Sequence, residues 1–441
     1  MQSAPSERSA EQASEESGAA GWQWDGEEGG GGAEAGDVVS GGGEPDGPWL
    51  SRRRLLTGAG VLAAGGAVWA FTRSAGGGSA PQPPKPAPTR LAGPEPLWTY
   101  RGPEAMTPER LTDRPGLPVF LSRGGLQVLD PAAGTRLRTL AFPAPGKDWP
   151  SDLELPAARV VVGANRVFTS SRGHIDSRHL TDSAADWSLP LPELLEGTVD
   201  LFGCDGSTLY GRSWAAPSTG DRIPATLFAL RIEDRTLRWS RPAEDVDVPL
   251  ATSTDRLPAR ATESGSTRLV LLDAADGRRV WVVPADENLR WAATDKEHVY
   301  VPDGQFGVRA LRLADGAARW SVLPGPSEEW RCLPPVSDGA RVYVPRDNGL
   351  ITAHDAATGA RIWSHRVPFR LDRRSRPLLA GPALYVPGPA AAGICALDAG
   401  SGAELWTFRD SGPGVDVWSL SADPARLYAG HDDILHALPL G

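Results

Sequence analysis

Short apolar runs alternate with polar turn residues from residue 97 to the C-terminus, in a pattern typical of β-strands. The clearest unit is 351–363, ITAHDAATGARIW, and its best copy is 394–406, ICALDAGSGAELW. The two units share four residue types at the same offsets, and these are Ala353, Asp355, Gly359 and Trp363, then Ala396, Asp398, Gly402 and Trp406. Each unit predicts a strand, a tight turn and a second strand that carries a large aromatic side chain.

Each shared residue type suits one place in such a unit. Asp can cap the turn with its side chain, and Gly can adopt a backbone angle that other residues resist. Trp is large enough to fill a groove on the neighbouring unit. We therefore expect turn caps rather than metal ligands at the two Asp positions. The expected docking residues are Asp355, Gly359, Trp363, Asp398, Gly402 and Trp406.

The number of repeats follows from two separate series. The docking position recurs at intervals of 39 to 52 residues, at Trp98, Leu137, Trp187, Trp239, Trp281, Trp320, Trp363 and Trp406. The second series consists of apolar runs near residues 119, 167, 209, 256, 299, 342, 384 and 427. Both series have eight members, and a unit of about 40 to 45 residues with four strands is typical of a propeller blade. We predict an all-β fold, an eight-bladed β-propeller.

The two ends of the repeat region complement each other. Residues 434–440, ILHALPL, resemble the strand before the turn but stop before any Trp, whereas residues 97–100, LWTY, supply a Trp-bearing strand. A propeller closes its ring without leaving a free sheet edge. We therefore predict that both termini build the last blade and that the propeller spans residues 97–441.

The segments before residue 97 differ in composition. Residues 1–50 hold eleven acidic residues and one basic residue, so this Gly-rich tail is predicted to be disordered. Residues 51–71 place Arg52 and Arg53 before about seventeen uncharged residues, which resembles a twin-arginine export signal. An uncleaved membrane anchor stays open as an alternative. Residues 72–96 form a Gly/Ser/Pro-rich linker, and the protein is expected to be exported, then either anchored or secreted.

Charge and cysteine content exclude some kinds of partner. The acidic tail accounts for the net charge of −10, because 44 basic and 44 acidic residues remain from Ser51 onward. The predicted propeller therefore has no global field that would attract nucleic acid. Cys204, Cys332 and Cys395 lie far apart without metal-ligand spacing, so no metal site is expected from them. They are either three buried thiols or one disulfide and a free thiol.

The pattern A-x-D-x-x-x-G-x-x-x-W resembles the repeat of pyrroloquinoline quinone (PQQ)-like propellers, in the quinoprotein alcohol dehydrogenase-like superfamily. It is complete in 353–363 and 396–406, whereas Leu271 replaces the Ala, Arg312 the Asp and Arg138 the Trp in three other repeats. In enzymes, the resemblance implies a quinone and a calcium ion over the central channel, with a catalytic Asp. This chain lacks the adjacent cysteine pair of many such enzymes and their large insertions. We therefore expect no catalytic residues and no cofactor, with PQQ and calcium as the alternative.

Four Trp residues outside the docking series mark a candidate binding surface. They precede the predicted innermost strands, whose ends line the mouth of the central channel. Two arginines beside them could contact anions or aromatic rings. The candidate ligand-binding residues are Trp149, Trp291, Trp330, Trp418, Arg290 and Arg331. The alternative for the Trp residues is packing between blades.

These observations favour a non-enzymatic, exported scaffold, expected to be monomeric, that binds a protein, a peptide or an envelope glycan at one face. The nearest functional analogy is the eight-bladed propeller lipoprotein of the outer-membrane barrel-assembly machine, and this analogy concerns the fold. No Cys lies near the apolar segment here to form a lipobox. Two alternatives remain. One is a PQQ-dependent dehydrogenase or a degenerate relative of one, and the other is the sensor domain of an envelope signalling system.

Overall fold

The computed structural model describes most of the chain from Ala92 onward. The predictions for residues 1–50, for 51–71 with Arg52 and Arg53, and for 72–91 lie outside the described residues and stay predictions. Within the described part, no helix is long and apolar enough to cross a membrane. The described residues are 92–106, 117–122, 124–141, 160–171, 174–191, 195, 198–214, 225–243, 246–251, 255–304, 306–323, 330–412, 414 and 416–440.

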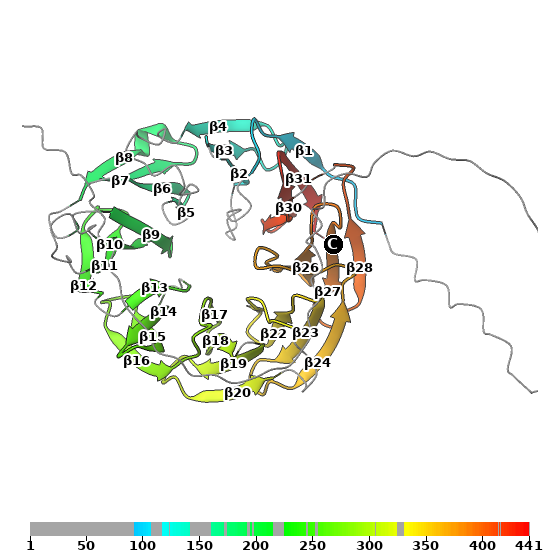
Figure 1. The fold of residues 1–441 in the computed structure, drawn as a ribbon. Helices are drawn as coiled ribbons and strands as arrows, with labels where there is room; N and C mark the ends of the chain where they lie inside the picture. Colours follow the sequence, from blue (N-terminus) through cyan, green and yellow to red (C-terminus); the bar gives the residue numbers. More distant parts are fainter. Residues whose placement is uncertain are drawn as a thin grey trace, which may run out of the picture. The chain divides into compact units, whose positions relative to one another are not determined.

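The described strands form eight antiparallel sheets that follow one another around a ring (Figure 1). Each sheet is one blade, and we number the blades in chain order. Blade 1 contains β2 (Val119–Ser122), β3 (Gly125–Leu129) and β4 (Arg136–Ala141), and blade 2 contains β5 (Val160–Gly163), β6 (Arg166–Ser171), β7 (His174–His179) and β8 (Trp187–Pro190). Blade 3 contains β9 (Thr198–Cys204), β10 (Thr208–Trp214), β11 (Thr226–Arg231) and β12 (Leu237–Pro242). Blade 4 contains β13 (Val246–Pro249), β14 (Arg256–Glu263), β15 (Ser266–Asp273) and β16 (Arg279–Pro284).

Blades 5 to 8 continue the ring with the same order of strands from the inside outward. Blade 5 contains β17 (Ala293–Thr294), β18 (His298–Asp303), β19 (Gly307–Arg312) and β20 (Ala318–Val322), and blade 6 contains β21 (Val336–Ser337), β22 (Arg341–Pro345), β23 (Leu350–Asp355) and β24 (Arg361–Arg366). Blade 7 contains β25 (Leu378–Ala380), β26 (Ala383–Pro387), β27 (Ile394–Asp398) and β28 (Glu404–Phe408). Blade 8 contains β29 (Ser419–Ala422), β30 (Arg426–His431), β31 (Ile434–Pro439) and β1 (Trp98–Arg101). A 3-10 turn, η2 (Ser183–Ala185), precedes β8. The predicted eight-bladed propeller is confirmed.

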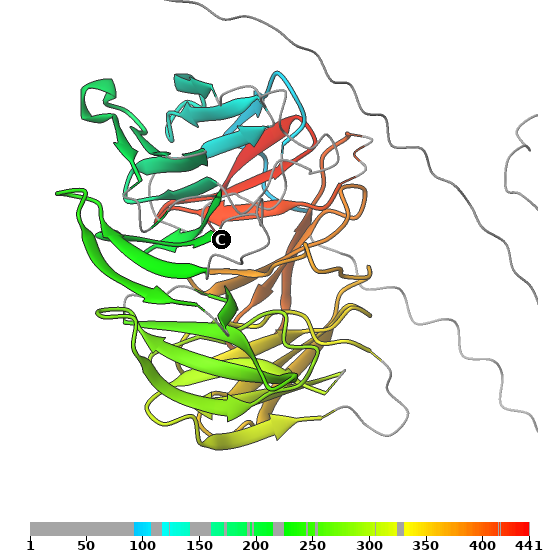
Figure 2. The same cartoon turned by 60° about the vertical axis from the view of Figure 1, so that its left-hand side comes forward.

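Both termini build blade 8, as predicted. β1 pairs antiparallel with β31, from Trp98 opposite Ala437 to Arg101 opposite Ile434. Figure 1 shows the two strands side by side, and the turned view in Figure 2 shows the blades as twisted sheets around the ring. The end of the predicted linker also touches the propeller, because the Gly93 N–H donates to the Thr407 carbonyl of β28 at 2.9 Å.

Blade 1 has three strands among the described residues instead of four. An isolated bridge between Met106 and Ser122 takes the place next to β2 where an innermost strand would lie. Residues 107–116, which follow that bridge, are outside the described residues.

The repeated turn docks one blade on the next. In blade 6, Asp355 Oδ1 accepts hydrogen bonds from the backbone N–H and the hydroxyl of Thr358, at 2.8 and 2.7 Å. Gly359 follows with φ of 72°. The Trp320 indole of blade 5 lies against this glycine and donates to the Ala356 carbonyl at 2.8 Å. The turn therefore forms a seat for the tryptophan of the preceding blade.

The same geometry joins blades 6 and 7. The Trp363 indole donates to the Ala399 carbonyl at 3.1 Å, and its ring lies against Gly402, whose φ is also 72°. Asp398 Oδ1 caps this turn through the backbone N–H and hydroxyl of Ser401, each at 2.7 Å. The hydrogen bonds from Ser401 hold the pKa of Asp398 below its usual value.

Blade 1 docks through an arginine. Arg138 pairs with Val128 in the register that Trp363 has with Ala353, so Arg138 occupies the docking position. Its guanidinium contacts Asp186 at 2.7 Å and donates to the His179 carbonyl. The assignment of Leu137 to the docking series is wrong, because its side chain is half exposed and belongs to the opposite face of the strand.

A hydrogen bond between a Tyr and an Asp recurs at the turn between the first and second strands of a blade. In four blades, a Tyr hydroxyl donates to an Asp five residues earlier, and the other oxygen of that Asp caps the turn. The pairs are Tyr210 with Asp205, Tyr300 with Asp295, Tyr343 with Asp338 and Tyr428 with Asp423. Burial and the neighbouring Asp338 raise the pKa of Tyr343 to about 12. These tyrosines are therefore neutral hydrogen-bond donors in the core.

The hydrophobic core lies between neighbouring blades. In one of its clusters, Trp363 and Tyr343 of blade 6 pack with Leu384 and Leu397 of blade 7. The three cysteines are buried and not in disulfides, which agrees with the reading as buried thiols. Each blade is thus stabilised mainly by the next blade around the ring.

The strand order defines two faces. Neighbouring strands are antiparallel, so the connections alternate between the two faces of the ring. One face carries the connections between the second and third strands of each blade and the connections from one blade to the next. We call this side the loop face. The other side, where the short turns capped by Asp lie, is the turn face.

Candidate functional site

A pocket of about 590 Å³ opens on the loop face where blades 5, 6 and 7 meet. Its walls come from the connections between β16 and β17, between β20 and β21, and between β24 and β25. Three predicted site residues, Arg290, Trp291 and Arg331, line this pocket. The structure therefore brings together residues that lie about one repeat apart in the sequence.

The pocket lining is rich in arginine. Arg373 and Arg376, which the sequence analysis missed, lie there with Arg290 and Arg331. Their guanidinium groups form no ion pair and no hydrogen bond with another residue in the part of the chain that the structure describes. Four guanidinium groups without a partner among the described residues favour an acidic ligand.

Two carboxylates share the pocket, and they differ in their contacts. Asp372 is engaged by its own loop, because its oxygens accept hydrogen bonds from Arg374 and Ser375. Asp347 Oδ1 is buried and has no hydrogen-bond partner among the described residues. A buried acceptor without a partner is costly, so this oxygen favours a ligand or a water that donates to it.

Trp291 combines the two roles that the sequence left open. Its ring is half-buried and packs against a cluster that contains Tyr300, Cys332 and Val342. The remainder of the side chain faces the pocket. This residue therefore contributes to the contact between blades 5 and 6 and also offers aromatic area to a ligand.

Trp330 lies beside the pocket on the same connection as Arg331. Its side chain is 37% exposed, and the Arg370 guanidinium lies 5.3 Å from the ring centroid. An exposed Trp held by a cation–π contact is available to a partner without a large change in the core.

Two predicted residues do not join this site. Trp418 is fully buried, and its indole donates to the Ala390 carbonyl at 3.0 Å, so the expectation that it contacts a ligand is wrong. The position before an innermost strand was right, but the ring turns into the core between blades 7 and 8. Trp149 lies outside the described residues.

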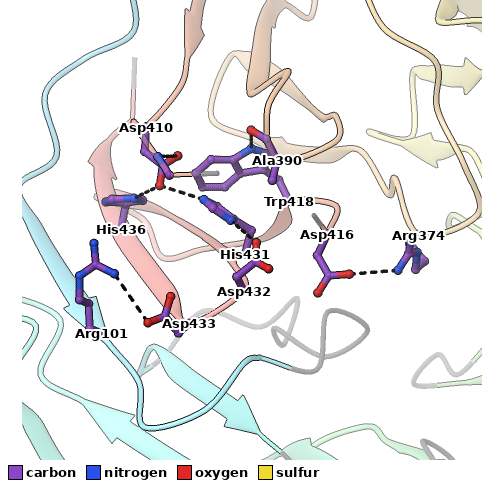
Figure 3. A network of polar contacts seen from close by, with 11 residues as sticks. Arg101, Arg374, Ala390, Asp410, Asp416, Trp418, His431, Asp432, Asp433 and His436 are labelled. Atoms are coloured by element: carbon purple, nitrogen blue, oxygen red, sulfur yellow. Dashed lines mark hydrogen bonds and ion pairs between the residues drawn. The ribbon is translucent and has the colours of Figure 1, made fainter. Parts of the chain in front are cut away.

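Arg374, which donates to the pocket residue Asp372, also belongs to a network of polar contacts near blade 8 (Figure 3). Arg374 contacts Asp416 at 3.4 Å, between the connections that precede blades 7 and 8. The Asp416 carbonyl accepts from the Ala390 N–H at 2.6 Å, next to the indole of Trp418. These bonds join three loops of neighbouring blades into one surface.

The inner part of the network centres on Asp410. One of its oxygens lies 2.8 Å from His431 Nε2 and 3.3 Å from His436 Nε2. His431 Nδ1 lies 2.7 Å from Asp432, and His436 Nδ1 lies 2.9 Å from the Thr99 hydroxyl of β1. Burial would raise the pKa of Asp410, but the hydrogen bonds from both histidines lower it below its usual value. Burial lowers the pKa of His436.

This histidine network is structural. The side chains of His431 and His436 are 1% and 7% exposed, and Trp418 packs against His431 with ring centroids 4.2 Å apart. A substrate would have no access to either imidazole. No sequence motif indicates this network, because Asp410 and His431 stand 21 residues apart with no motif between them.

The carboxylates of the pocket do not fit a calcium ion. Calcium binds six to eight oxygen ligands. The pocket offers two carboxylates, of which Asp372 already accepts several hydrogen bonds from its own loop. Four arginines around them would oppose a divalent cation.

The blades and their tryptophan docking define the chain as an eight-bladed, PQQ-like β-propeller. The family model described as "Outer membrane protein assembly factor BamB" matches residues 183–331 and 306–438, which together cover more than half of the chain. The chain belongs to this family. No curated protein matches the sequence.

Solved structures share the fold at low sequence identity. The crystal structure of BamB from Moraxella catarrhalis has a TM-score of 0.50 at 14% identity, over 79% of this chain and 100% of that one. The computationally designed Ika8 protein has a TM-score of 0.55 at 13% identity, over 80% of this chain and 99% of that one. Both similarities concern the fold alone.

Proposed function

We propose that this protein is a non-enzymatic, extracytoplasmic scaffold that binds an acidic segment of a protein or peptide at the loop face of blades 5 to 7. The observation that carries the proposal is the pocket that joins Trp291 to four arginines whose guanidinium groups have no partner among the described residues. Arginine and tryptophan are the residue types most enriched at binding hot spots. Carboxylates of the ligand would pair with the guanidinium groups, and an apolar side chain would lie on Trp291.

Family membership supports a role in assembly. The family is described as an outer-membrane protein assembly factor, and its members share this fold with the present chain. We propose that the protein likewise holds a partner protein in the cell envelope. Arg52 and Arg53 before an apolar stretch support export, with the propeller outside the cytoplasm.

We also propose that the protein works without PQQ or calcium. The pocket offers two carboxylates, of which Asp372 is engaged by its own loop, whereas calcium needs six to eight oxygen ligands. A melting temperature that stays constant when PQQ and calcium are added supports this proposal. A clear rise in the melting temperature would favour the PQQ-dependent dehydrogenase instead.

Peptide binding by the full-length chain tests the proposal. We expect a labelled acidic peptide with one aromatic residue to bind in a fluorescence anisotropy titration, and more weakly as salt increases. The double variant Arg290→Ala with Arg331→Ala should bind at least about tenfold more weakly, since each lost charge pair is worth about 1 kcal/mol or more.

The matched control is Arg319→Ala, which removes an arginine from a separate pocket on the turn face. This variant should bind like the parent protein. Equal affinity of the parent protein and the double variant would contradict the proposal, and so would the absence of binding to any acidic peptide at millimolar concentration.

A further inference from the structure

Three metal-ligating side chains from two blades meet between blades 6 and 7, away from the pocket. They are His365 on β24, Cys395 on β27 and Glu404 at the start of β28. One donor atom of each lies within 4.8 Å of the donor atoms of the other two. Cys395 is fully buried, whereas His365 and Glu404 are half-buried.

The fold places these side chains on facing surfaces. His365 lies two residues after Trp363, so both point from β24 toward blade 7. The Trp363 indole donates a hydrogen bond to the Ala399 carbonyl and thereby fixes the position of β24 relative to blade 7. In blade 7, Cys395 pairs with Thr407 and therefore shares its face of the sheet.

The carboxylate of Glu404 is already oriented. The Thr407 hydroxyl donates to Glu404 Oε1 at 2.8 Å, which turns the carboxylate toward Cys395 along the same face. Ligating carboxylates in metal sites are commonly held by such a second hydrogen bond. Thr407 is in turn fixed by the Gly93 N–H, which donates to its carbonyl.

We propose that His365, Cys395 and Glu404 bind one zinc ion, or a similar divalent transition metal, between blades 6 and 7. Thiolate, imidazole and carboxylate are the zinc donor types, whereas calcium and magnesium require oxygen ligands. A water molecule would complete the tetrahedron. Zn–S and Zn–N bonds of about 2.3 and 2.0 Å place tetrahedral ligands about 3.5 Å apart, so rotation of the His and Glu side chains closes the site.

The site has a structural consequence. Its ligands come from both blades, so a bound ion cross-links blade 6 to blade 7 at the outer part of the ring. An ion that binds the folded state stabilises it by mass action. Zinc should therefore raise the melting temperature of the whole propeller.

Zinc titration of the metal-free, full-length protein tests this inference. We expect one zinc ion per chain in competition with a chromophoric chelator, and a higher melting temperature when zinc is present. His365→Ala and Glu404→Gln should each weaken binding at least about tenfold. These two half-buried positions keep the test informative even where Cys395→Ser folds poorly.

Cys204→Ser is the matched control, because Cys204 is also a buried thiol but lies in blade 3. It should bind zinc like the parent protein, and zinc should protect Cys395 from alkylation in both. The inference is overturned if the parent protein binds no zinc. It is also overturned if the His365→Ala and Glu404→Gln variants bind zinc as tightly as the parent protein does.

Discussion

The seat that Gly359 forms for Trp320 can be tested by adding one carbon atom. In Gly359→Ala, the new Cβ would lie 2.7 Å from the indole ring of Trp320, which must move. The matched control is Gly381→Ala in the turn between β25 and β26, where φ is also positive, at 58°, and nothing lies within 4 Å of the new Cβ.

Both variants place an L-residue at a positive φ, but only Gly359→Ala also disturbs the contact with Trp320. An L-residue at such a φ costs about 1–2 kcal/mol, and the stiffer unfolded chain returns about 0.4–1 kcal/mol. Gly381→Ala should therefore destabilise by about 1 kcal/mol. Gly359→Ala adds overpacking of about 1–3 kcal/mol and the loss of the Trp320 hydrogen bond to Ala356, about 1 kcal/mol. The expected difference between the variants is about 2–4 kcal/mol.

Urea unfolding followed by circular dichroism and by tryptophan fluorescence measures this difference, provided that the m-values agree. If the variants differ by less than about 0.5 kcal/mol, the turn does not hold the tryptophan and the docking account is refuted. A large loss in both variants would assign the cost to backbone strain alone.

Three further predictions concern closure, pH and the exposed aromatic. Deleting residues 97–101 removes β1 and leaves the edge of β31 unpaired, so the cooperative urea transition should be lost; an unchanged transition would contradict closure by the termini. Burial acts to raise the pKa of Asp295, but hydrogen bonds from Tyr300 and two backbone N–H groups lower it below its usual value. The ionised carboxylate therefore stabilises the fold above about pH 4 and loses this effect as the pH falls further. Asp295→Asn should cost about 1–3 kcal/mol at pH 7 and less at pH 3, and equal losses in calorimetry would show that ionisation is irrelevant. Trp330→Ala should shift the melting temperature by no more than about 2 °C, since the ring is 37% exposed, and a larger drop would place it in the core.

The fold could be predicted because its determinants repeat. The sequence shows Asp355, Gly359 and Trp363 at fixed offsets, and the turn, the seat and the docked ring follow from the chemistry of those three residue types. A substitution within the repeat was harder to place. The repeat pattern places Arg138 at a docking position, but the ion pair with Asp186 through which it docks could not be predicted, because Asp186 carries no repeated signal.

The candidate site was only partly predictable. Trp291 and Arg331 could be proposed because they precede innermost strands, but the same rule selected Trp418, whose ring turns into the core. Sequence position fixes which loop a side chain belongs to, and packing decides which way it points. Arg373 and Arg376 come from a third connection that carries no repeated signal, so only the folded ring brings them to the pocket.

Site-specific photo-crosslinking in the host cell tests the proposed binding of a partner protein at the loop face of blades 5 to 7. A photoreactive amino acid at Arg290 probes the loop-face pocket, and one at Arg319 probes the turn face. We predict a discrete crosslinked protein from position 290 and none from position 319. A crosslink from position 319 alone, or from neither position, would contradict the account.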